Sequence, residues 1–188
     1  MESYFQIRWH GRAQQGVVTA NQLLAWALVR GGRHVQAFPD FGPERGGAPI
    51  RAFTRVATKP IELHEKVYEP DVVIIIDNTL FKDPSTLKGL KKDGTLVLNT
   101  SYAPEEMRAH LKLGICKICT LDATKIAAEI FKKPYFNTAM IGGLARATEL
   151  IELNNILDAA KFMFEEKALE ANLEAIRRGY NEAKVLEL

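Results

Sequence analysis

The sequence is poor in cysteine: its 188 residues include only Cys116 and Cys119. A tetrahedral metal site or a cubane iron–sulfur cluster needs four ligands, and no second cysteine pair is present. The two cysteines lie in segment 115–121, which reads as a strand, and positions three apart on a strand point to opposite faces. We therefore predict two buried structural thiols and no metal site on this chain.

Long apolar runs and an excess of charge of one sign are also missing. No apolar stretch approaches the ~20 residues of a membrane span. The 25 basic and 23 acidic side chains give a net charge of +2 and form no basic block of the kind that binds nucleic acid. The first eight residues lack the charged-then-apolar layout of a secretion signal. We predict a cytoplasmic protein with no membrane span and no nucleic-acid partner.

Familiar catalytic motifs are absent as well. The sequence contains no G-x-S-x-G elbow, no Walker sequence and no H-E-x-x-H. Its four histidines are scattered, and only His10 lies beside a loop of interest. A histidine at the end of a buried strand is more often a hydrogen-bonded structural residue than a base. We therefore predict no catalytic residue on this chain.

The composition does support one well-packed domain over residues 1–188, because 47% of the side chains are apolar and 26% are charged. Short apolar strands alternate with helical segments, which is typical of βαβ units. The run Val72–Ile76 has no polar face and suits a central strand that is covered on both sides. We predict an α/β fold: a mostly parallel open sheet flanked by helices, with a helical C-terminal segment.

The expected elements follow from hydrophobic periodicity and from turn residues. We expect strands at residues 4–9, 34–38, 50–56, 72–76, 95–98 and 115–121. We expect helices at 17–30, 104–113, 123–131, 137–150 (capped by Asn137), from Asn155 or Asp158 to 166, and 168–183.

Residues 10–16, His10-Gly-Arg-Ala-Gln-Gln-Gly16, follow an apolar strand and precede an apolar helix. We call this segment the glycine elbow. A helix N-terminus presents free N–H groups and the positive end of a dipole, so such an elbow suits an anion, most often a phosphate. The candidate ligands are Gly11, Arg12, Gln14, Gln15 and Gly16. The alternative interpretation is a tight turn that only joins a strand to a helix.

A dinucleotide site is the obvious competing interpretation, since Gly11-x-Ala13-x-x-Gly16 nearly matches G-x-G-x-x-G. Ala13 replaces the middle glycine, which lets the backbone approach a pyrophosphate. The second strand should end in an acid for the ribose hydroxyls, but here Asp40 follows only after Pro39. A nicotinamide or flavin enzyme is therefore the weaker hypothesis.

Several segments together resemble the gamma subunit of 2-oxoacid:ferredoxin oxidoreductases, of the pyruvate:ferredoxin oxidoreductase type, or the equivalent domain of a fused chain. The elbow resembles the family loop H-G-R-G-G-Q-G. Residues 36–55, Gln36-Ala-Phe-Pro-Asp-Phe-Gly-Pro-Glu-Arg-Gly-Gly-Ala-Pro-Ile-Arg-Ala-Phe-Thr-Arg55, resemble Q-A-F-P-x-F-G-x-E-R-R-G-A-P-V-x-A-F-T-R. Segments 68–71 and 137–143 fit further parts of the family pattern.

The resemblance implies a multi-subunit enzyme that oxidatively decarboxylates a 2-oxoacid, with pyruvate as the default substrate, and passes the acyl group to coenzyme A. It implies that thiamine diphosphate with Mg and the [4Fe-4S] clusters belong to partner subunits, and that electrons leave to ferredoxin or a related acceptor. The gamma chain of such enzymes is associated with coenzyme A binding and with closure of the active site.

Coenzyme A carries a pyrophosphate and a 3′-phosphate, which Arg12 and the elbow amides would bind. Arg45 is a second candidate contact and Asn137 a third. The alternatives are an ion pair of Arg45 with Glu44 or a partner chain, and plain N-capping by Asn137, which we favour. In the elbow, Ala13 and Gln14 replace the Gly-Gly of the family, which narrows the loop and opposes positive φ.

Gly46 lies in the loop between Pro39 and Pro49, at a position where the family often has arginine. The glycine therefore removes one positive charge from this loop.

A second functional hypothesis is a non-catalytic assembly subunit. In that case the apolar tail, Val185, Leu186 and Leu188, would bind neighbouring chains or simply dock on its own domain.

Overall fold

A seven-stranded sheet forms the centre of the protein in the computed structural model, which describes residues 4–40 and 48–188. The predicted contact Arg45 and the departure at Gly46 lie outside these residues. The strand order is β2-β3-β1-β4-β5-β6-β7. The strands are β1 (Phe5–Arg12), β2 (His34–Asp40), β3 (Pro49–Ala57), β4 (Val72–Ile75), β5 (Thr95–Asn99), β6 (Lys117–Leu121) and β7 (Lys184–Leu186).

Most of the strands run in one direction. β1, β4, β5 and β6 pair in parallel, whereas β3 pairs antiparallel with both β1 and β2, so β2 runs the same way as β1. At the other edge, β7 pairs antiparallel with β6. The prediction of a mostly parallel sheet is confirmed. The insertion of β3 between β1 and β2 was not predicted, because strand order is not visible in local sequence patterns.

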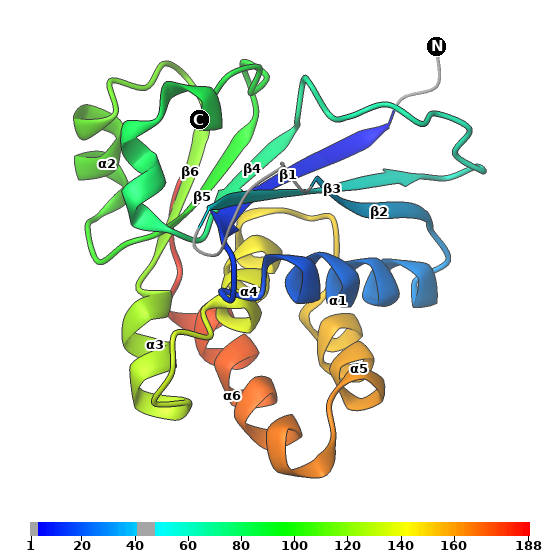
Figure 1. Ribbon diagram of the computed structural model, residues 1–188. Helices are drawn as coiled ribbons and strands as arrows, with labels where there is room; N and C mark the ends of the chain where they lie inside the picture. The colour runs from blue at the N-terminus through cyan, green and yellow to red at the C-terminus, as the bar shows by residue number, and fades with distance from the viewer. Residues whose placement is uncertain (1–3, 41–47) are drawn as a thin grey trace.

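Helices cover both faces of the sheet, as predicted (Figure 1). One face is covered by α1 (Val17–Arg30), α3 (Ala123–Ile130), α4 (Asn137–Ala147), α5 (Leu153–Met163) and α6 (Glu166–Glu182). The other face carries α2 (Pro104–His110) and two short 3-10 helices, η1 (Asn78–Lys82) and η2 (Pro84–Thr86). Within the described part of the chain, no helix is long and apolar enough to cross a membrane.

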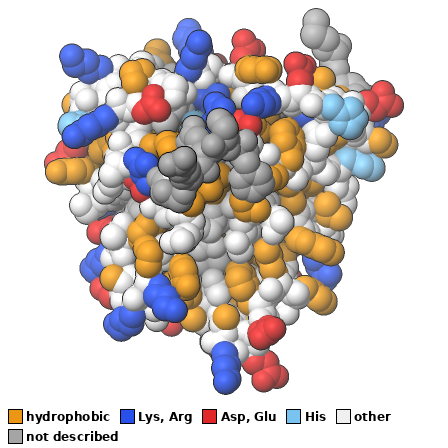
Figure 2. Space-filling view, viewed as in Figure 1, with side chains coloured by type: hydrophobic (Ala, Val, Ile, Leu, Met, Phe, Trp, Pro, Cys, Tyr) orange, Lys and Arg blue, Asp and Glu red, His pale blue; other side chains and the backbone are white. Residues whose placement is uncertain are grey.

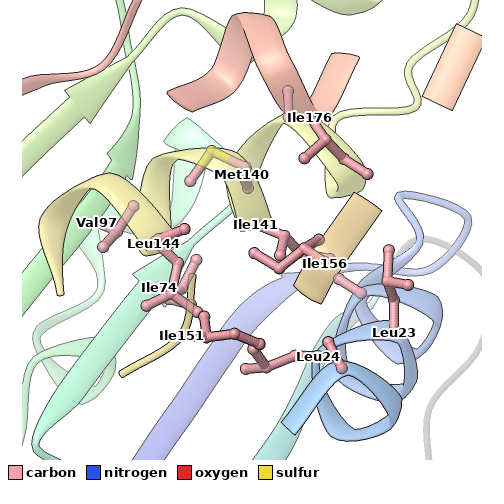
Figure 3. Packing of buried hydrophobic residues seen from close by; sticks show 14 of the residues in the cluster. Leu23, Leu24, Ile74, Val97, Met140, Ile141, Leu144, Ile151, Ile156 and Ile176 are labelled. Atoms are coloured by element: carbon pink, nitrogen blue, oxygen red, sulfur yellow. The ribbon is translucent and has the colours of Figure 1, made fainter. Parts of the chain in front are cut away.

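Two hydrophobic cores, one on each face of the sheet, explain the unbroken apolar run of β4. Ile74 and Ile76 join the core under the helical layer, whereas Val73 and Ile75 join the core under α2. Side chains of α1, α4, α5 and α6 belong to the same hydrophobic cluster as Ile74 (Figure 3). The prediction of a central strand covered on both sides is therefore confirmed.

The two cysteines lie on opposite faces of the sheet. Cys119 packs into the core under the helical layer and Cys116 into the core under α2, and both thiols are free and buried. Burial raises the pKa of both thiols, and that of Cys119 to about 12. The predicted geometry is confirmed, and two thiols so placed cannot share one metal ion.

Several element boundaries differ from the predicted ones. The first strand extends three residues further, to Arg12, because its end pairs with β3. The helix predicted to begin at Asn155 or Asp158 begins at Leu153, after Glu152. The last predicted helix begins at Glu166, two residues earlier than expected, so the helical C-terminal segment is confirmed. The tail after it forms β7, which was not predicted.

Candidate functional site

The turn of the glycine elbow is confined to Ala13–Gly16. Gly11 and Arg12 still belong to β1, where they pair with Ile50 and Pro49 of β3. Gly11 therefore lies at the strand end of the elbow and not in its turn. Its missing side chain serves close packing instead, because a Cβ at Gly11 would lie 2.5 Å from Cγ2 of Val17.

Two residues of the turn adopt left-handed conformations, with φ of 72° at Gln14 and 75° at Gly16. A glutamine pays a conformational cost there that the glycine of the family loop would not. The side chain at position 14 thus does not prevent positive φ, contrary to the expectation from the sequence. Gly16 leads directly into Val17, the first residue of α1.

Asn137 lies against the elbow and is not a helix cap. The N-cap of α4 is Phe136, and Asn137 is the first helical residue. A Cβ at Gly16 would lie 2.5 Å from Nδ2 of Asn137. The favoured interpretation of Asn137 as a plain N-cap is wrong. The residue is buried at the point where the start of α4 meets the start of α1.

A cavity of about 740 Å³ opens beside this junction. That size lies within the range of small-molecule sites. Its lining residues come from the elbow and the N-terminal ends of α1, α4 and α6, with the end of α3 and the segment after it: Arg12, Gln14, Gly16, Val17, Val18, Thr19, Ile50, Ile130, Phe131, Lys133, Tyr135, Asn137, Phe164, Lys167, Ala168, Ala171 and Asn172. On this side of the molecule, hydrophobic side chains are exposed across the helical half, with Lys and Arg side chains at its margins (Figure 2).

The cavity is suited to an anion with apolar parts. Arg12, Lys133 and Lys167 contribute positive charge, and none of the described lining residues is acidic. The first intrahelical hydrogen bond of α1 runs from Ala20 N to Gly16 O, so the N–H groups of the preceding turn point out of the helix end. The positive ends of helix dipoles add to the same potential.

Arg12 is held by residues that follow β4. Its Nε and Nη2 donate to the hydroxyl of Thr79 at 3.2 and 2.9 Å, and Nε lies 3.6 Å from Oδ2 of Asp77. Its main-chain N–H donates to Oε1 of Gln15 at 2.8 Å. The Arg12 side chain remains 34% exposed and forms part of the cavity wall.

Asp77 is the acceptor at the centre of these contacts. It accepts hydrogen bonds from Nε2 of Gln15, from the hydroxyl of Thr79, and from the N–H of Thr79 at 2.9 Å. Burial by itself would raise the pKa of Asp77, but the hydrogen bonds from Thr79 and Gln15 and the charge of Arg12 hold it below its ordinary value. The carboxylate is therefore ionised at neutral pH.

Four of the predicted site residues line the cavity: Arg12, Gln14, Gly16 and Asn137. The Gln15 amide is instead engaged by Arg12 and Asp77. Asp77, Lys133 and Lys167 were not among the predicted site residues. No local pattern marks these lysines, because they reach the cavity from segments far apart in the chain.

His10 belongs to a different environment. Its Nε2 accepts a hydrogen bond from Nε of the buried Arg8 at 2.9 Å. Burial first, and then the charges of Arg8 and Arg51, lower the pKa of His10 to about 3. The imidazole is therefore neutral at physiological pH.

The acid needed for a dinucleotide site is engaged elsewhere. Asp40 forms ion pairs with Arg51 at 2.7 Å and Lys66 at 2.9 Å. The dinucleotide hypothesis thus loses the group that would bind the ribose hydroxyls.

The donor set also argues against a metal centre on the part of the chain that is described. Among residues 4–40 and 48–188, no group of three or more His, Cys, Asp and Glu side chains is placed to hold a metal ion. With two cysteines on opposite faces of the sheet, these residues do not provide the ligand set of an iron–sulfur cluster.

Residues 6–182 match the family model described as pyruvate ferredoxin/flavodoxin oxidoreductase. The chain is 43% identical over 183 residues to the pyruvate/ketoisovalerate oxidoreductases common subunit gamma of Pyrococcus furiosus, covering 97% of this chain and 99% of that one. It is 44% identical to the pyruvate synthase subunit PorC of Thermotoga maritima, covering 99% and 98%.

Solved structures agree with these matches. The crystal structure of the PORC subunit of pyruvate oxidoreductase from Thermotoga maritima aligns over all of both chains, with a TM-score of 0.87 and 43% identity. A 2-oxoglutarate:ferredoxin oxidoreductase from Magnetococcus marinus, solved with 2-oxoglutarate, coenzyme A and succinyl-CoA bound, has a TM-score of 0.77. It is 19% identical and the match covers 31% of that chain, so it shows a shared fold alone.

Proposed function

The chain belongs to the pyruvate ferredoxin/flavodoxin oxidoreductase family, and we propose that it is the gamma subunit of a multi-subunit 2-oxoacid oxidoreductase, in which it binds coenzyme A. The observation that carries this proposal is the cavity at the glycine elbow, where helix N-termini and three cations converge on apolar walls without an acidic residue among the described ones. Coenzyme A joins phosphate groups to an apolar arm and an adenine ring, and so has the chemistry that this cavity would accept.

In this proposal, Arg12 and the N–H groups of Gln14, Gly16 and the first turn of α1 bind phosphate oxygens, whereas the N–H of Gln15 donates to the carbonyl oxygen of Arg12 at 3.2 Å. Charge-assisted hydrogen bonds of this kind are the strong ones in proteins. Lys133 and Lys167 supply further positive charge at the cavity wall. Asn137 offers an amide beside the elbow.

Apolar side chains of the cavity would receive the rest of the ligand. Ile130, Phe131 and Phe164 provide surface for the pantetheine arm and the adenine ring. Gly11 contributes indirectly, because it lets β1 approach α1. Arg45, outside the described residues, stays a proposed second contact.

The remaining chemistry belongs to partner subunits in this proposal. Thiamine diphosphate with Mg supports decarboxylation of the 2-oxoacid, and [4Fe-4S] clusters conduct the electrons to ferredoxin or a related acceptor. This chain binds coenzyme A, brings its thiol to the reaction and helps to close the active site. Two free thiols suit a reducing compartment, and we place the complex in the cytoplasm.

Pyruvate is the proposed 2-oxoacid, because relatives covering nearly the whole chain are named as pyruvate synthase or pyruvate/ketoisovalerate subunits. The 2-oxoacid would bind beside thiamine diphosphate, and hence on partner chains. A branched-chain 2-oxoacid is therefore compatible with this same subunit.

Arg12→Ala in the assembled enzyme tests the proposal. A charge-assisted hydrogen bond contributes ~1.5–3 kcal/mol, so the KM for coenzyme A should rise by about ten- to a hundredfold while the KM for pyruvate stays the same. Arg33→Ala is the matched control, because Arg33 is exposed beyond the other end of α1, about 20 Å away. An unchanged KM for coenzyme A in Arg12→Ala would contradict the proposed site and favour a purely assembling subunit.

A further inference from the structure

We propose that Asp77 is a positioning residue of the coenzyme A site, which acts through Gln15 and Thr79 to fix both the main chain and the guanidinium of Arg12. This inference rests on the proposed function, and it adds a residue that touches no ligand itself. Asp77 follows β4, whereas Arg12 ends β1, and these two strands are neighbours in the sheet.

Thr79 makes the first connection between Asp77 and Arg12. A hydroxyl has one proton to donate, and the Thr79 proton goes to Oδ1 of Asp77. The lone pairs of the Thr79 oxygen therefore face Arg12, whose Nε and Nη2 donate to it at 3.2 and 2.9 Å. The carboxylate thus sets the direction of the hydroxyl, and the hydroxyl sets the direction of the guanidinium.

Gln15 makes the second connection, between Asp77 and the main chain of Arg12. Its Nε2 donates to Oδ2 of Asp77, and its Oε1 accepts the main-chain N–H of Arg12 at 2.8 Å. Because the amide has one donor end and one acceptor end, the carboxylate decides which way it points. Turned over, the amide would present its N–H groups to the Arg12 N–H and break the bond that holds the elbow.

Asp77 also has a purely structural task, which must be separated from this one. It is the N-cap of η1 and accepts the N–H of Thr79 at 2.9 Å. Asparagine caps about as well as aspartate, because its carbonyl oxygen accepts the same bond. Asp77→Asn therefore keeps the cap, but it turns one acceptor into a donor that faces the Gln15 amide.

The contact between residues 15 and 77 can be inverted in the double variant Gln15→Glu/Asp77→Asn. The carboxylate introduced at position 15 accepts from the amide introduced at position 77, and its other oxygen still accepts the Arg12 N–H. The net charge of the pair is unchanged. The inverted pair restores the elbow contact without restoring Asp77 itself.

The experiment compares KM values in the assembled enzyme. We expect Asp77→Asn to raise the KM for coenzyme A about tenfold, as for one lost hydrogen bond to a charged group, with the KM for pyruvate unchanged. The double variant should recover most of that loss. Asp83→Asn is the matched control, since Asp83 caps η2 through the Ser85 N–H at the same 2.9 Å and should leave both KM values unchanged.

The KM values of the variants for coenzyme A either support the role of Asp77 or overturn it. A tenfold rise in Asp77→Asn that the double variant reverses supports it. A normal KM for coenzyme A in Asp77→Asn, with a raised KM in Arg12→Ala, overturns it and leaves the coenzyme A site standing. A loss that the inverted pair does not recover also overturns it, because the damage is then structural. Normal values in both Arg12→Ala and Asp77→Asn overturn the proposed function as well.

Discussion

His10 is a neutral, buried imidazole whose acceptor nitrogen is fixed by Arg8. Since Nε2 accepts that hydrogen bond, the proton of the ring lies on Nδ1. The groups with charge nearby are Arg8, Arg51 and Asp83, and the two arginines favour the neutral form. This environment makes His10 a structural residue rather than a base, which is the interpretation that its place at a strand end favoured.

The depressed pKa of His10 makes stability depend on pH. Between its ordinary pKa of about 6.5 and its folded pKa of about 3, the unfolded chain binds the proton and the folded chain does not. Stability from this group is therefore lost as the pH falls through that window, by roughly 2 kcal/mol between pH 7 and pH 5.

The measurement is urea unfolding at pH 7 and at pH 5, on the wild type and on His10→Gln. Glutamine can still accept from Arg8 but does not titrate, so the variant should lose roughly 2 kcal/mol less on acidification. Equal losses in the two proteins would show that His10 does not resist protonation in the folded state.

Single residues of the site were only partly predictable. Arg12 and Gly16, which line the cavity, could be predicted as candidates because a short glycine spacing between a strand and a helix has a local physical meaning. Asn137 could not be interpreted correctly, since its contact with Gly16 joins segments that are distant in sequence. The same holds for Asp77, whose partners Gln15 and Arg12 lie on another strand connection.

At the level of the elements, α4 is the helix on which the others are packed. It is buried along almost its whole length between the sheet and α6. Glycines make the close approach possible: a Cβ at Gly142 would lie 2.2 Å from the carbonyl oxygen of Ile176, and one at Gly179 would lie 2.0 Å from that of Ala139. Because α4 begins at the elbow, this packing also places Asn137.

Gly179→Ala should destabilise the protein. Alanine would gain about 0.5–1 kcal/mol in helix propensity, but backbone atoms surround the new methyl group and overpacking of this kind costs about 1–3 kcal/mol or more. We therefore expect a net loss of at least about 1 kcal/mol in chemical unfolding. The matched control is Gly114→Ala, which has no atom within 4 Å of the new Cβ and should change stability by less than about 0.5 kcal/mol. A neutral Gly179→Ala would mean that α4 and α6 can separate without cost.

For the whole molecule, the fold is that of the PORC subunit of Thermotoga maritima pyruvate oxidoreductase, which aligns over all of both chains. The apolar tail pairs with β6 as β7, and Lys117 and Glu187 form an ion pair at 2.8 Å beside it. The sequence left two arrangements open for the tail, and the structure shows the one in which the tail docks on its own domain.

The isolated chain should bind coenzyme A and yet reduce no electron acceptor with pyruvate and coenzyme A. In the proposed function, thiamine diphosphate and the clusters lie on partner chains, so the redox steps need those chains. Acceptor reduction should appear only when the partner subunits are added, and partner subunits without this chain serve as the control. Steady turnover by the isolated chain would refute the subunit assignment.

Local sequence patterns were enough to predict the α/β class, the two-sided burial of β4, the opposed cysteines and a turn between β1 and α1. Each of these follows from periodicity or spacing within a short segment, where covalent geometry fixes which side chains share a face. Three arrangements could be seen only in the folded molecule: β3 lies between β1 and β2, Asn137 meets Gly16, and Asp77 meets Arg12 beside a cavity that Lys133 and Lys167 also line. These contacts join distant segments, and their positions depend on how whole elements pack to bury apolar surface.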